Sequence, residues 1–267
     1  MALGTKIYYS KDVLDFTKTP EWWQVGTVSG NASALAFSSD ANHLYVGSES
    51  GKIYRISNLG YAYNADRADI SSENCVVAVS QISEFANRKV TSIAVDPQDN
   101  QHIVITLGNY GNNDYVYNCT NSLDSLPNFT SVQGNLPKAP VYSSLIEMNN
   151  SGMVILGTEN GVFVTENITS ATWSKDSGPM GTIPVFALKQ QTLDFPGLYV
   201  PNPDPNIPGV NYPAFTNYGV IYAATYGRAL WASNSYVGIK DTPGSKTSKN
   251  LSLKLNPNPV TESANID

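Results

Sequence analysis

The stretch His43–Asn58, HLYVGSESGKIYRISN, contains two short apolar runs separated by a polar turn that ends in glycine. Short apolar runs bounded by glycine- or asparagine-containing turns predict a β-hairpin. A closely similar stretch, MVILGTENGVFVTEN, recurs at Met153–Asn167. The chain therefore repeats one hairpin unit, and a repeat of this kind decides the class of fold.

The second run of this hairpin occurs five times, and the five copies align without gaps. Each copy starts with apolar or aromatic residues and ends on Asp or Asn. Their last residues are 46, 63, 46 and 67 positions apart, so the base period is 46 with two insertions. The copies are KIYYSKD (Lys6–Asp12), KIYRISN (Lys52–Asn58), YVYNCTN (Tyr115–Asn121), GVFVTEN (Gly161–Asn167) and RALWASN (Arg228–Asn234).

Further strand-like runs precede these copies in the same order. Four of the copies are directly preceded by a second run: HLYVGS, HIVITL, MVILGT and VIYAAT. A third run lies further upstream: SALAFS, TSIAVD, SSLIEM and VFALKQ. A less regular fourth run includes the regions of Trp22 and Trp173. Four short antiparallel strands per repeat are typical of a β-propeller blade. A single four-stranded sheet cannot bury both of its faces, whereas radially stacked sheets cover one another. We therefore predict an all-β propeller; a β-sandwich is the alternative, but sandwiches do not repeat at a fixed period.

The strand order at the two ends predicts an incomplete ring. If the strands of a blade are numbered outward from the axis, the chain begins in the third and fourth strands of one blade. It ends in the first three strands of another blade, so both ends supply a third strand. We expect about five blades that form an arc of a larger ring, most simply a seven-bladed one. The alternative is a small closed ring in which the extra strand pairs irregularly.

Composition excludes several classes of function. Lys and Arg number 16 against 22 Asp and Glu, which gives a net charge of −6 without a basic cluster, so a nucleic-acid partner is not expected. No apolar run approaches the ~20 residues of a membrane-spanning helix, and the first residues do not resemble a signal peptide. Cys75 and Cys119 form either one disulfide or two buried thiols. Their spacing fits no zinc site, and we expect no metal and no cofactor.

One blade sequence identifies a family likeness. YAATYGRALW at Tyr222–Trp231 resembles a blade motif of bacterial sialidase-like, sortilin-like and xyloglucanase-like propellers. The segment after Gly161 resembles an Asp-box, whose pattern is S-x-D-x-G-x-T-W, with Thr165, Asn167 and Trp173 in the expected places. Ser10 and Asp12, followed by a tryptophan pair, resemble a second copy with a longer turn. The resemblance implies a structural hairpin in which the Asp or Asn accepts N–H bonds of the turn and the Trp packs between blades.

The C-terminal part differs in composition from the repeats. We assign residues 4–239 to the propeller and 240–250 to a linker rich in Gly, Ser, Thr and Lys. Residues 251–267, which begin LSLKLNPNPVTE, resemble the start of the C-terminal sorting domain of type IX secretion substrates, with Asn256 in place of the usual Tyr. This resemblance implies an interaction with the type IX machinery and export to the outside or the outer-membrane surface of a Gram-negative bacterium.

Residues suited to catalysis are few. The four arginines do not suggest the arginine triad that the family resemblance associates with sialidases. Glycosidases need two carboxylates about 5 to 9 Å apart, and Asp96 and Glu147, near the ends of equivalent innermost strands, are the weak candidates. The Asp-Pro-Gln-Asp-Asn peptide at Asp96 is better explained as a turn. His43 and His102 occupy equivalent blade positions, which favours a structural role for both.

The two insertions indicate where binding takes place, because binding residues concentrate on loops that depart from a scaffold. About 24 residues, Asp194–Asn217, are added between the first and second strands of the last blade, and about 12 are added after Asn58. Both insertions lie at the same end of a propeller. We predict that their aromatic residues stack on sugar rings or on a protein partner; the alternative is that they hold their own loops against the blades. The candidates are Tyr61, Tyr63, Tyr199, Tyr212 and Phe215.

These features predict a secreted or surface-attached propeller that acts as a non-catalytic binding or scaffold module for a glycan or a protein. The alternative function is a glycoside hydrolase of xyloglucanase or sialidase type whose catalytic residues lie partly outside this sequence. Further blades with two axial carboxylates or an arginine triad would favour the enzyme.

Overall fold

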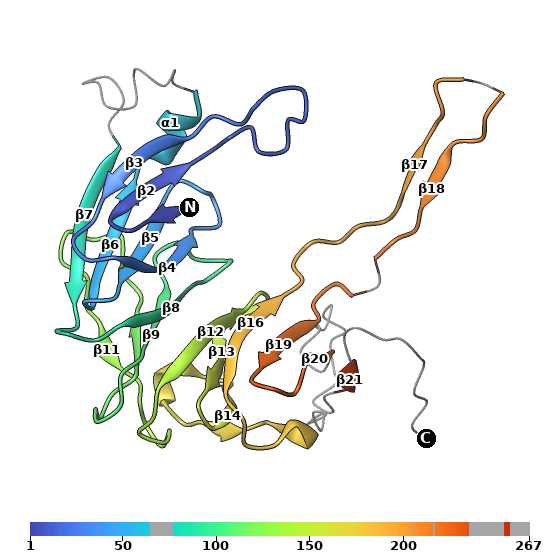
Figure 1. Cartoon of the computed structure of the whole chain (residues 1–267). Helices are drawn as coiled ribbons and strands as arrows, with labels where there is room; N and C mark the ends of the chain where they lie inside the picture. The colour runs from blue at the N-terminus through green and yellow to red at the C-terminus, as the bar shows by residue number, and fades with distance from the viewer. Residues whose placement is uncertain (65–76, 205, 216, 235–253, 257–267) are drawn as a thin grey trace.

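The fold was analysed in a computed structural model that describes residues 1–64, 77–204, 206–215 and 217–234, together with the backbone of 254–256. Five antiparallel sheets follow one another along the chain, and we number them blade 1 to blade 5 (Figure 1). In blades 2, 3 and 4 the strand order across the sheet is the order in the chain. The same holds in blade 5, apart from an inserted hairpin. This is the meander that the repeat predicts.

The elements have the following bounds. Blade 1 contains β1 (Ala2–Leu3), β2 (Lys6–Tyr9) and β3 (Trp23–Thr27); blade 2 contains β4 (Ala32–Phe37), β5 (Leu44–Ser48), β6 (Lys52–Ser57) and β7 (Ala78–Glu84); blade 3 contains β8 (Val90–Val95), β9 (Ile103–Leu107), β10 (Val116–Cys119) and β11 (Thr130–Ser131). Blade 4 contains β12 (Val141–Glu147), β13 (Asn150–Thr158), β14 (Gly161–Thr165) and β15 (Ser174–Lys175); blade 5 contains β16 (Val185–Gln190), β19 (Ile221–Thr225), β20 (Leu230–Ser233) and β21 (Lys254–Asn256). Outside the blades lie α1 (Leu59–Asn64), the 3₁₀ turns η1 (Ile168–Ser170) and η2 (Gly178–Met180), and the hairpin β17 (Leu198–Val200) with β18 (Val210–Tyr212).

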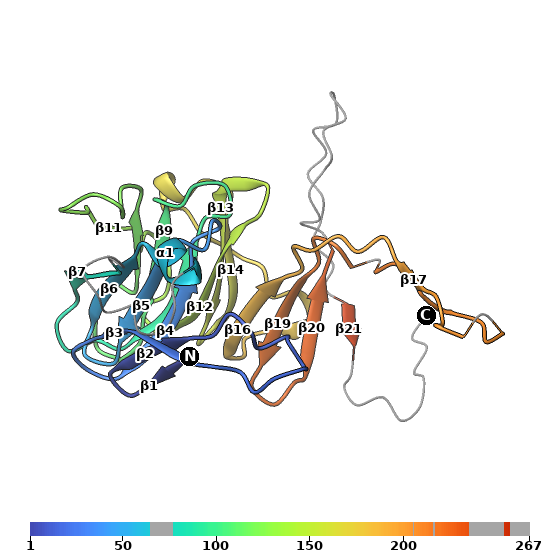
Figure 2. The same ribbon diagram turned by 90° about the horizontal axis from the view of Figure 1, so that it is seen from above.

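The predicted propeller architecture is confirmed. The innermost strands of neighbouring blades contact each other in sequence, β4 with β8, β8 with β12 and β12 with β16. Figures 1 and 2 show the blades along an arc, with blade 1 and blade 5 at its two ends rather than packed together. The five sheets agree with the expected number of blades, and the larger ring stays a prediction.

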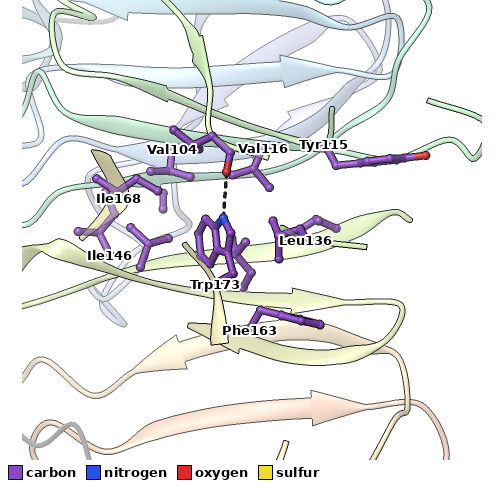
Figure 3. Close-up of a cluster of buried hydrophobic side chains, with 13 residues drawn as sticks. Val104, Tyr115, Val116, Leu136, Ile146, Phe163, Ile168 and Trp173 are labelled. Carbon is purple, nitrogen blue, oxygen red and sulfur yellow. Dashed lines mark hydrogen bonds between the residues drawn. The ribbon is translucent and has the colours of Figure 1, made fainter. Parts of the chain in front are cut away.

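Hydrophobic cores lie between the blades. The core between blades 3 and 4 combines Val104 and Val116 from one sheet with Ile146 and Phe163 from the next, and Trp173 is buried among them (Figure 3). Three further clusters occupy the corresponding places between the other neighbours. Because both faces of an inner blade are covered, strands such as β5, β9 and β14 are buried along their whole length.

The fifth repeat copy is displaced by one residue from its predicted alignment. In blade 4 Gly157 pairs with Val162, whereas in blade 5 Ala224 pairs with Leu230. The turn before β20 is one residue longer and holds Ala229 at a φ of 61°, so Leu230 rather than Ala229 corresponds to Val162. The gap-free alignment is therefore wrong for this copy. A slip of one residue exchanges the two faces of a strand, and it turns Trp231 into the core between blades 4 and 5.

The last blade has a fourth strand that the sequence did not assign to it. The backbone of β21 pairs with β20, so blade 5 does not end at its third strand. The sequence analysis gave these residues to the start of a sorting domain. The linker and nearly all of that tail lie outside the described residues, and the division into three regions stays a prediction.

Two further expectations concern a thiol pair and a membrane span. Cys119 is buried, and its Sγ lies 3.4 Å from Asn121 Oδ1. Cys75 lies outside the described residues, so the choice between disulfide and free thiols stays open. Within the described part of the chain, no helix has the length and apolar character to cross a membrane.

Candidate functional site

Asp96, one of the two candidate acids, is fully buried at the end of β8. Its Oδ1 accepts a hydrogen bond from the backbone N–H of Gln98 at 2.8 Å, and its Oδ2 lies 2.9 Å from Nδ1 of His102. Nε2 of His102 lies 2.8 Å from Oδ1 of Asn118. The carboxylate therefore closes its own turn and ties it to the second and third strands of the blade.

The charge state of Asp96 does not suit a general acid. Burial alone would raise the pKa of its carboxyl, but hydrogen bonds from Ser151, Gln98 and His102 outweigh burial and hold the pKa below its usual value. A catalytic acid needs a raised pKa so that it keeps a proton near neutral pH. Asp96 instead has the properties of a buried carboxylate with a structural role.

Glu147, the other candidate acid, lies at the end of β12, and both of its carboxylate oxygens also accept hydrogen bonds. Its Oε1 accepts a hydrogen bond from Gln190 Nε2 at 2.9 Å, and its Oε2 accepts one from the backbone N–H of Asn149 at 2.9 Å. Gln98 donates across the blade boundary to the carbonyl of Met148 at 3.0 Å. These contacts fix the inner turns and join successive blades.

The two histidines occupy equivalent places, as predicted. Nδ1 of His43 lies 3.1 Å from Oγ of Ser57 on the third strand of its blade, as His102 faces Asn118 on the third strand of the next. Both imidazoles thus link the second strand of a blade to the third. This repetition argues for a structural contribution by each histidine.

The turn at Asn167 has the contacts that the Asp-box resemblance implies. Oδ1 of Asn167 accepts a hydrogen bond from the backbone N–H of Thr169 at 3.1 Å, and Thr165 Oγ1 donates to the carbonyl of Asn167 at 3.0 Å. Nε1 of the buried Trp173 donates to the carbonyl of Val132 in the preceding blade at 2.9 Å (Figure 3). The turn therefore anchors the blade 3–blade 4 boundary, and its membership in the Asp-box family stays a prediction.

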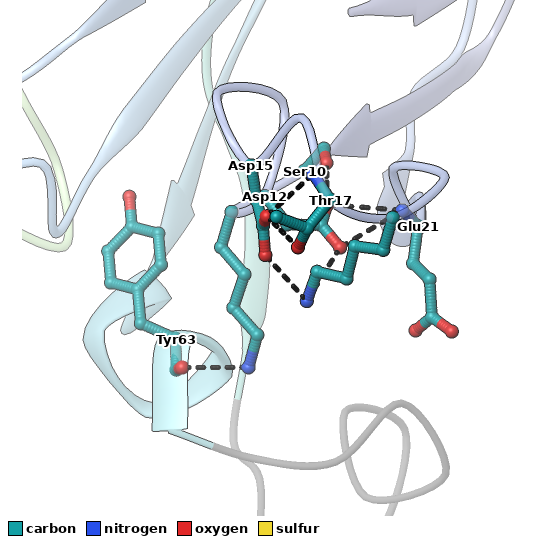
Figure 4. A network of polar contacts seen from close by, with 8 residues as sticks. Ser10, Asp12, Asp15, Thr17, Glu21 and Tyr63 are labelled. Atoms are coloured by element: carbon teal, nitrogen blue, oxygen red, sulfur yellow. Dashed lines mark hydrogen bonds and ion pairs between the residues drawn. The ribbon is translucent and has the colours of Figure 1, made fainter. Parts of the chain in front are cut away.

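A related turn follows β2. Ser10 Oγ donates to Oδ1 of Asp12 at 2.6 Å, and the same oxygen accepts the backbone N–H of Glu21 at 3.1 Å (Figure 4). Lys18 lies 3.4 Å from the carboxylate. Hydrogen bonding from Ser10 is the main cause that lowers the pKa of Asp12. This geometry fits a turn-closing acid.

The predicted ligand-binding aromatics in the first insertion have different environments. Leu59 and Ala62 fix α1 to blades 1 and 2, since both are buried in the core there. Tyr63 packs edge-on against Tyr9 at 5.5 Å and donates its hydroxyl to the carbonyl of Ala41 at 3.0 Å. Tyr63 thus holds its loop in place, as the alternative interpretation proposed, whereas Tyr61 is 63% exposed.

The second insertion forms the β17–β18 hairpin, which extends away from blade 5 (Figure 1). Tyr199, Tyr212 and Phe215 are 50% to 61% exposed there. Phe215 packs on Phe195 at 4.9 Å near the base of the hairpin. Figures 1 and 2 place α1 and this hairpin on different blades, so Tyr61 does not join the hairpin residues in one site.

Sequence reasoning missed a second group of aromatic residues, at the opposite end of the blades. Tyr142 and Phe186 are the second residues of two successive innermost strands, and Tyr226 lies in the turn after β19. An aromatic residue at the same place in two successive repeats was the available signal. In the described part of the chain, no group of three or more His, Cys, Asp or Glu side chains is arranged to hold a metal ion.

No protein-family model matches this sequence, and no curated protein is significantly similar to it. Solved structures do resemble the fold. Sqt1 from Chaetomium thermophilum gives a TM-score of 0.54 at 15% identity, over 87% of this chain and 52% of that chain. The same protein solved bound to the N-terminus of the ribosomal protein L10 gives 0.50 at 14% identity, over 87% and 54%. An ancestral GH74 enzyme gives 0.50 at 17% identity, over 87% and 28%.

This chain spans about half the length of Sqt1 and less than a third of the GH74 enzyme. Identities this low carry information about the fold but not about activity. The chain therefore has a β-propeller fold, which known proteins use both in an enzyme and in a protein that binds a partner.

Proposed function

We propose that this propeller is a non-catalytic binding module that engages a protein partner through the β17–β18 hairpin. The observation that carries the proposal is the surface of the hairpin. Besides its tyrosines it exposes Leu198, Val200 and Val210, each more than two-fifths accessible. Exposed apolar side chains gathered on one element mark interaction sites.

The backbone of the hairpin supports the same proposal. Within the described residues β17 and β18 pair only with each other, so each strand has an outer edge without a neighbouring strand. Such an edge accepts an added strand, with backbone hydrogen bonds for affinity and alternate side chains for specificity. A protein partner with an extended apolar segment fits this edge better than a sugar does.

The test begins with identification of the partner. A photo-reactive amino acid at Tyr199 of the full-length protein captures the contacting protein in its own cells, and the purified partner is then titrated calorimetrically. Replacement of residues 196–214 by a short Gly-Ser turn should abolish that binding and leave the thermal midpoint within a few degrees. Tyr61→Ala is the matched control, because it removes an exposed aromatic elsewhere. Undiminished binding by the replaced variant contradicts the proposal.

The proposed location is the exterior or the outer-membrane surface of a Gram-negative cell. It is supported by the resemblance of the C-terminal sequence to a type IX sorting domain. Deletion of residues 257–267 from the full-length protein leaves β21 in blade 5 and should move the protein from the medium or surface fraction into the cells. Normal export of the deletion variant excludes this route.

The alternative function, glycoside hydrolysis, is supported by the family resemblance and by the similarity of fold to a GH74 enzyme. The hydrogen bonds that occupy Asp96 and Glu147 weigh against it. Incubation of the full-length protein with a glycan panel should release no reducing sugar. Release that is lost in Asp96→Asn, with an unchanged circular dichroism spectrum, would establish the enzyme instead.

A further inference from the structure

Each of the four four-stranded blades has a β-bulge at the same place. The second residue of the innermost strand is left out of the pairing in β4, β8, β12 and β16. These four bulged residues are Ser33, Thr91, Tyr142 and Phe186. They lie at the end of the blades opposite α1 and the β17–β18 hairpin, because the innermost strands begin there. Bulges redirect side chains and are frequent beside functional sites.

In blades 2 and 3 the bulged residue has a clear structural role. Ser33 Oγ donates to the carbonyl of Val90 at 2.7 Å, which is the first residue of the next innermost strand. Thr91 Oγ1 donates to the carbonyl of Val141 at 2.5 Å in the same manner. A small hydroxyl at the bulge thus joins each blade to the following one.

Blades 4 and 5 depart from this pattern. Tyr142 and Phe186 replace the small hydroxyls, and their rings contact each other at 5.0 Å with planes at 62°. Phe186 in turn contacts Tyr226 at 6.0 Å with planes at 86°. Phe186 is 48% exposed and Tyr226 is 70% exposed. In blade 4 the hydroxyl that would bond to the next blade is thus absent from the bulge, and the neighbouring Ser143 joins blades 4 and 5 by accepting a hydrogen bond from the backbone N–H of Leu188 at 3.0 Å.

Polar groups accompany these rings. The hydroxyl of Tyr142 donates to Oε2 of Glu159, in the β13–β14 turn, at 2.5 Å. Burial is the main cause that raises the pKa of Tyr142, and hydrogen bonds with Glu159 and Tyr110 raise it further. Tyr110, in the turn before β10, is 67% exposed. We call Tyr110, Tyr142, Glu159, Phe186 and Tyr226 the bulge row.

We propose that the bulge row is a binding site for a neutral saccharide. Aromatic faces pack against the C–H faces of sugar rings, and the carboxylate and phenol groups hydrogen-bond with sugar hydroxyls. The row differs from the hairpin in having no aliphatic member, which suits a sugar rather than an apolar peptide. It extends across blades 3, 4 and 5, so it presents an elongated surface to an oligosaccharide. This site is separate from the proposed protein-binding hairpin.

Packing alone does not account for the row. The same bulge is satisfied by Ser33 and Thr91 in the two earlier blades, so the scaffold does not require a large side chain there. Phe186 and Tyr226 are 48% and 70% exposed, so burial contributes little to keeping aromatic rings at these two places, since the hydrophobic contribution follows the area removed from water. Tyr142 is partly buried and packs against the ring of Phe186. The two exposed rings therefore point to a ligand.

The test is native affinity electrophoresis of the full-length protein in gels that contain hydroxyethyl cellulose, xyloglucan, laminarin, galactomannan or pullulan. We expect at least one polysaccharide to retard the protein. Tyr226→Ala should weaken that retardation about tenfold, the loss of one aromatic contact. Tyr61→Ala, at the opposite end, should have no effect.

A second variant separates binding from folding. Tyr142→Ser restores the small hydroxyl that Ser33 provides in blade 2, so the fold should be retained while the row is interrupted. It should reduce retardation as strongly as Tyr226→Ala, with an unchanged circular dichroism spectrum. The proposal is overturned if no polysaccharide retards the wild type, or if both row variants migrate as the wild type does. It is equally overturned if Tyr226→Ala instead abolishes binding of the protein partner.

Discussion

The hairpin and the bulge row lie at opposite ends of the same blades and are built in different ways. The hairpin is an insertion between β16 and β19, belongs to one blade, and makes its own strand pairing. The bulge row has no inserted element, because its side chains come from the strands and turns of three blades. One surface depends on a loop, and the other depends on how successive blades are packed.

The difference shows two ways in which a repeat scaffold gains a surface. An insertion leaves the blade strands unchanged and adds exposed backbone edges along with side chains. A substitution at a repeated bulge keeps the backbone conformation and changes only the side chain at that position. The second way requires accurate packing between blades, since neighbouring members of the row come from different blades.

The largest effect is expected from Trp173→Ala, which leaves a cavity between blades 3 and 4. Removal of a buried tryptophan costs about 3–5 kcal/mol, and the hydrogen bond to Val132 is lost as well. Because the row crosses this boundary and the hairpin does not, polysaccharide retardation should fall while partner binding persists below the unfolding midpoint. The free energy of unfolding is measured by denaturant titration. If Trp173→Ala does not fold, Trp173→Phe is measured in its place. An equal loss of polysaccharide retardation and of partner binding would contradict the difference between the bulge row and the hairpin.

A smaller effect is expected from Tyr142→Phe, and it depends on pH. The pKa of Tyr142 is raised in the folded protein above its ordinary value of 10.0, so the folded state holds this proton more tightly than the unfolded chain. Its contribution to stability is present below pH 10 and is lost as the pH rises from there toward the folded pKa. Between pH 9 and about pH 11.5, wild-type stability should fall more steeply than that of Tyr142→Phe. Parallel profiles would show that burial and the hydrogen bond to Glu159 do not raise the pKa of Tyr142 in the folded protein.

The smallest effect distinguishes the two tyrosines of the first insertion. Tyr63→Phe removes the hydrogen bond to Ala41 and should cost about 1 kcal/mol. Tyr61→Phe should change stability by less than about 0.5 kcal/mol, because this ring is exposed. Thermal unfolding of both variants under identical conditions makes the comparison. A larger loss for Tyr61→Phe would reverse the assignment of which residue holds the loop.

Much of the fold was predictable because it repeats. The recurrence of the KIYRISN-like copies indicated the blades, and apolar runs such as HIVITL located the buried second strands. The prediction was wrong by one residue in the last copy, because periodicity does not reveal the extra residue in the turn that contains Ala229. The pairing of β21 in blade 5 was also missed, since that stretch was interpreted by its resemblance to another domain.

The candidate site was less predictable. Aromatic residues in an insertion could be named from the sequence, but their environments could not: Tyr63 is held against Tyr9, while Tyr199 is exposed on a projecting hairpin. The bulge row was not anticipated, because a bulge appears only in the register between two strands. Tyr142 and Phe186 are 44 positions apart in the sequence, and no local pattern around either residue shows that their rings are in contact.

By itself the sequence determined the strand-forming repeat, the stacking of sheets that this repeat requires, and the two insertions. Those properties follow from local alternation and from the need of each apolar face for a cover. Only the tertiary structure decided which aromatic side chains stay on the surface and which carboxylates are already bonded. The physical reason is that exposure and hydrogen-bond partners depend on neighbouring blades, which lie about 46 residues or more away along the chain.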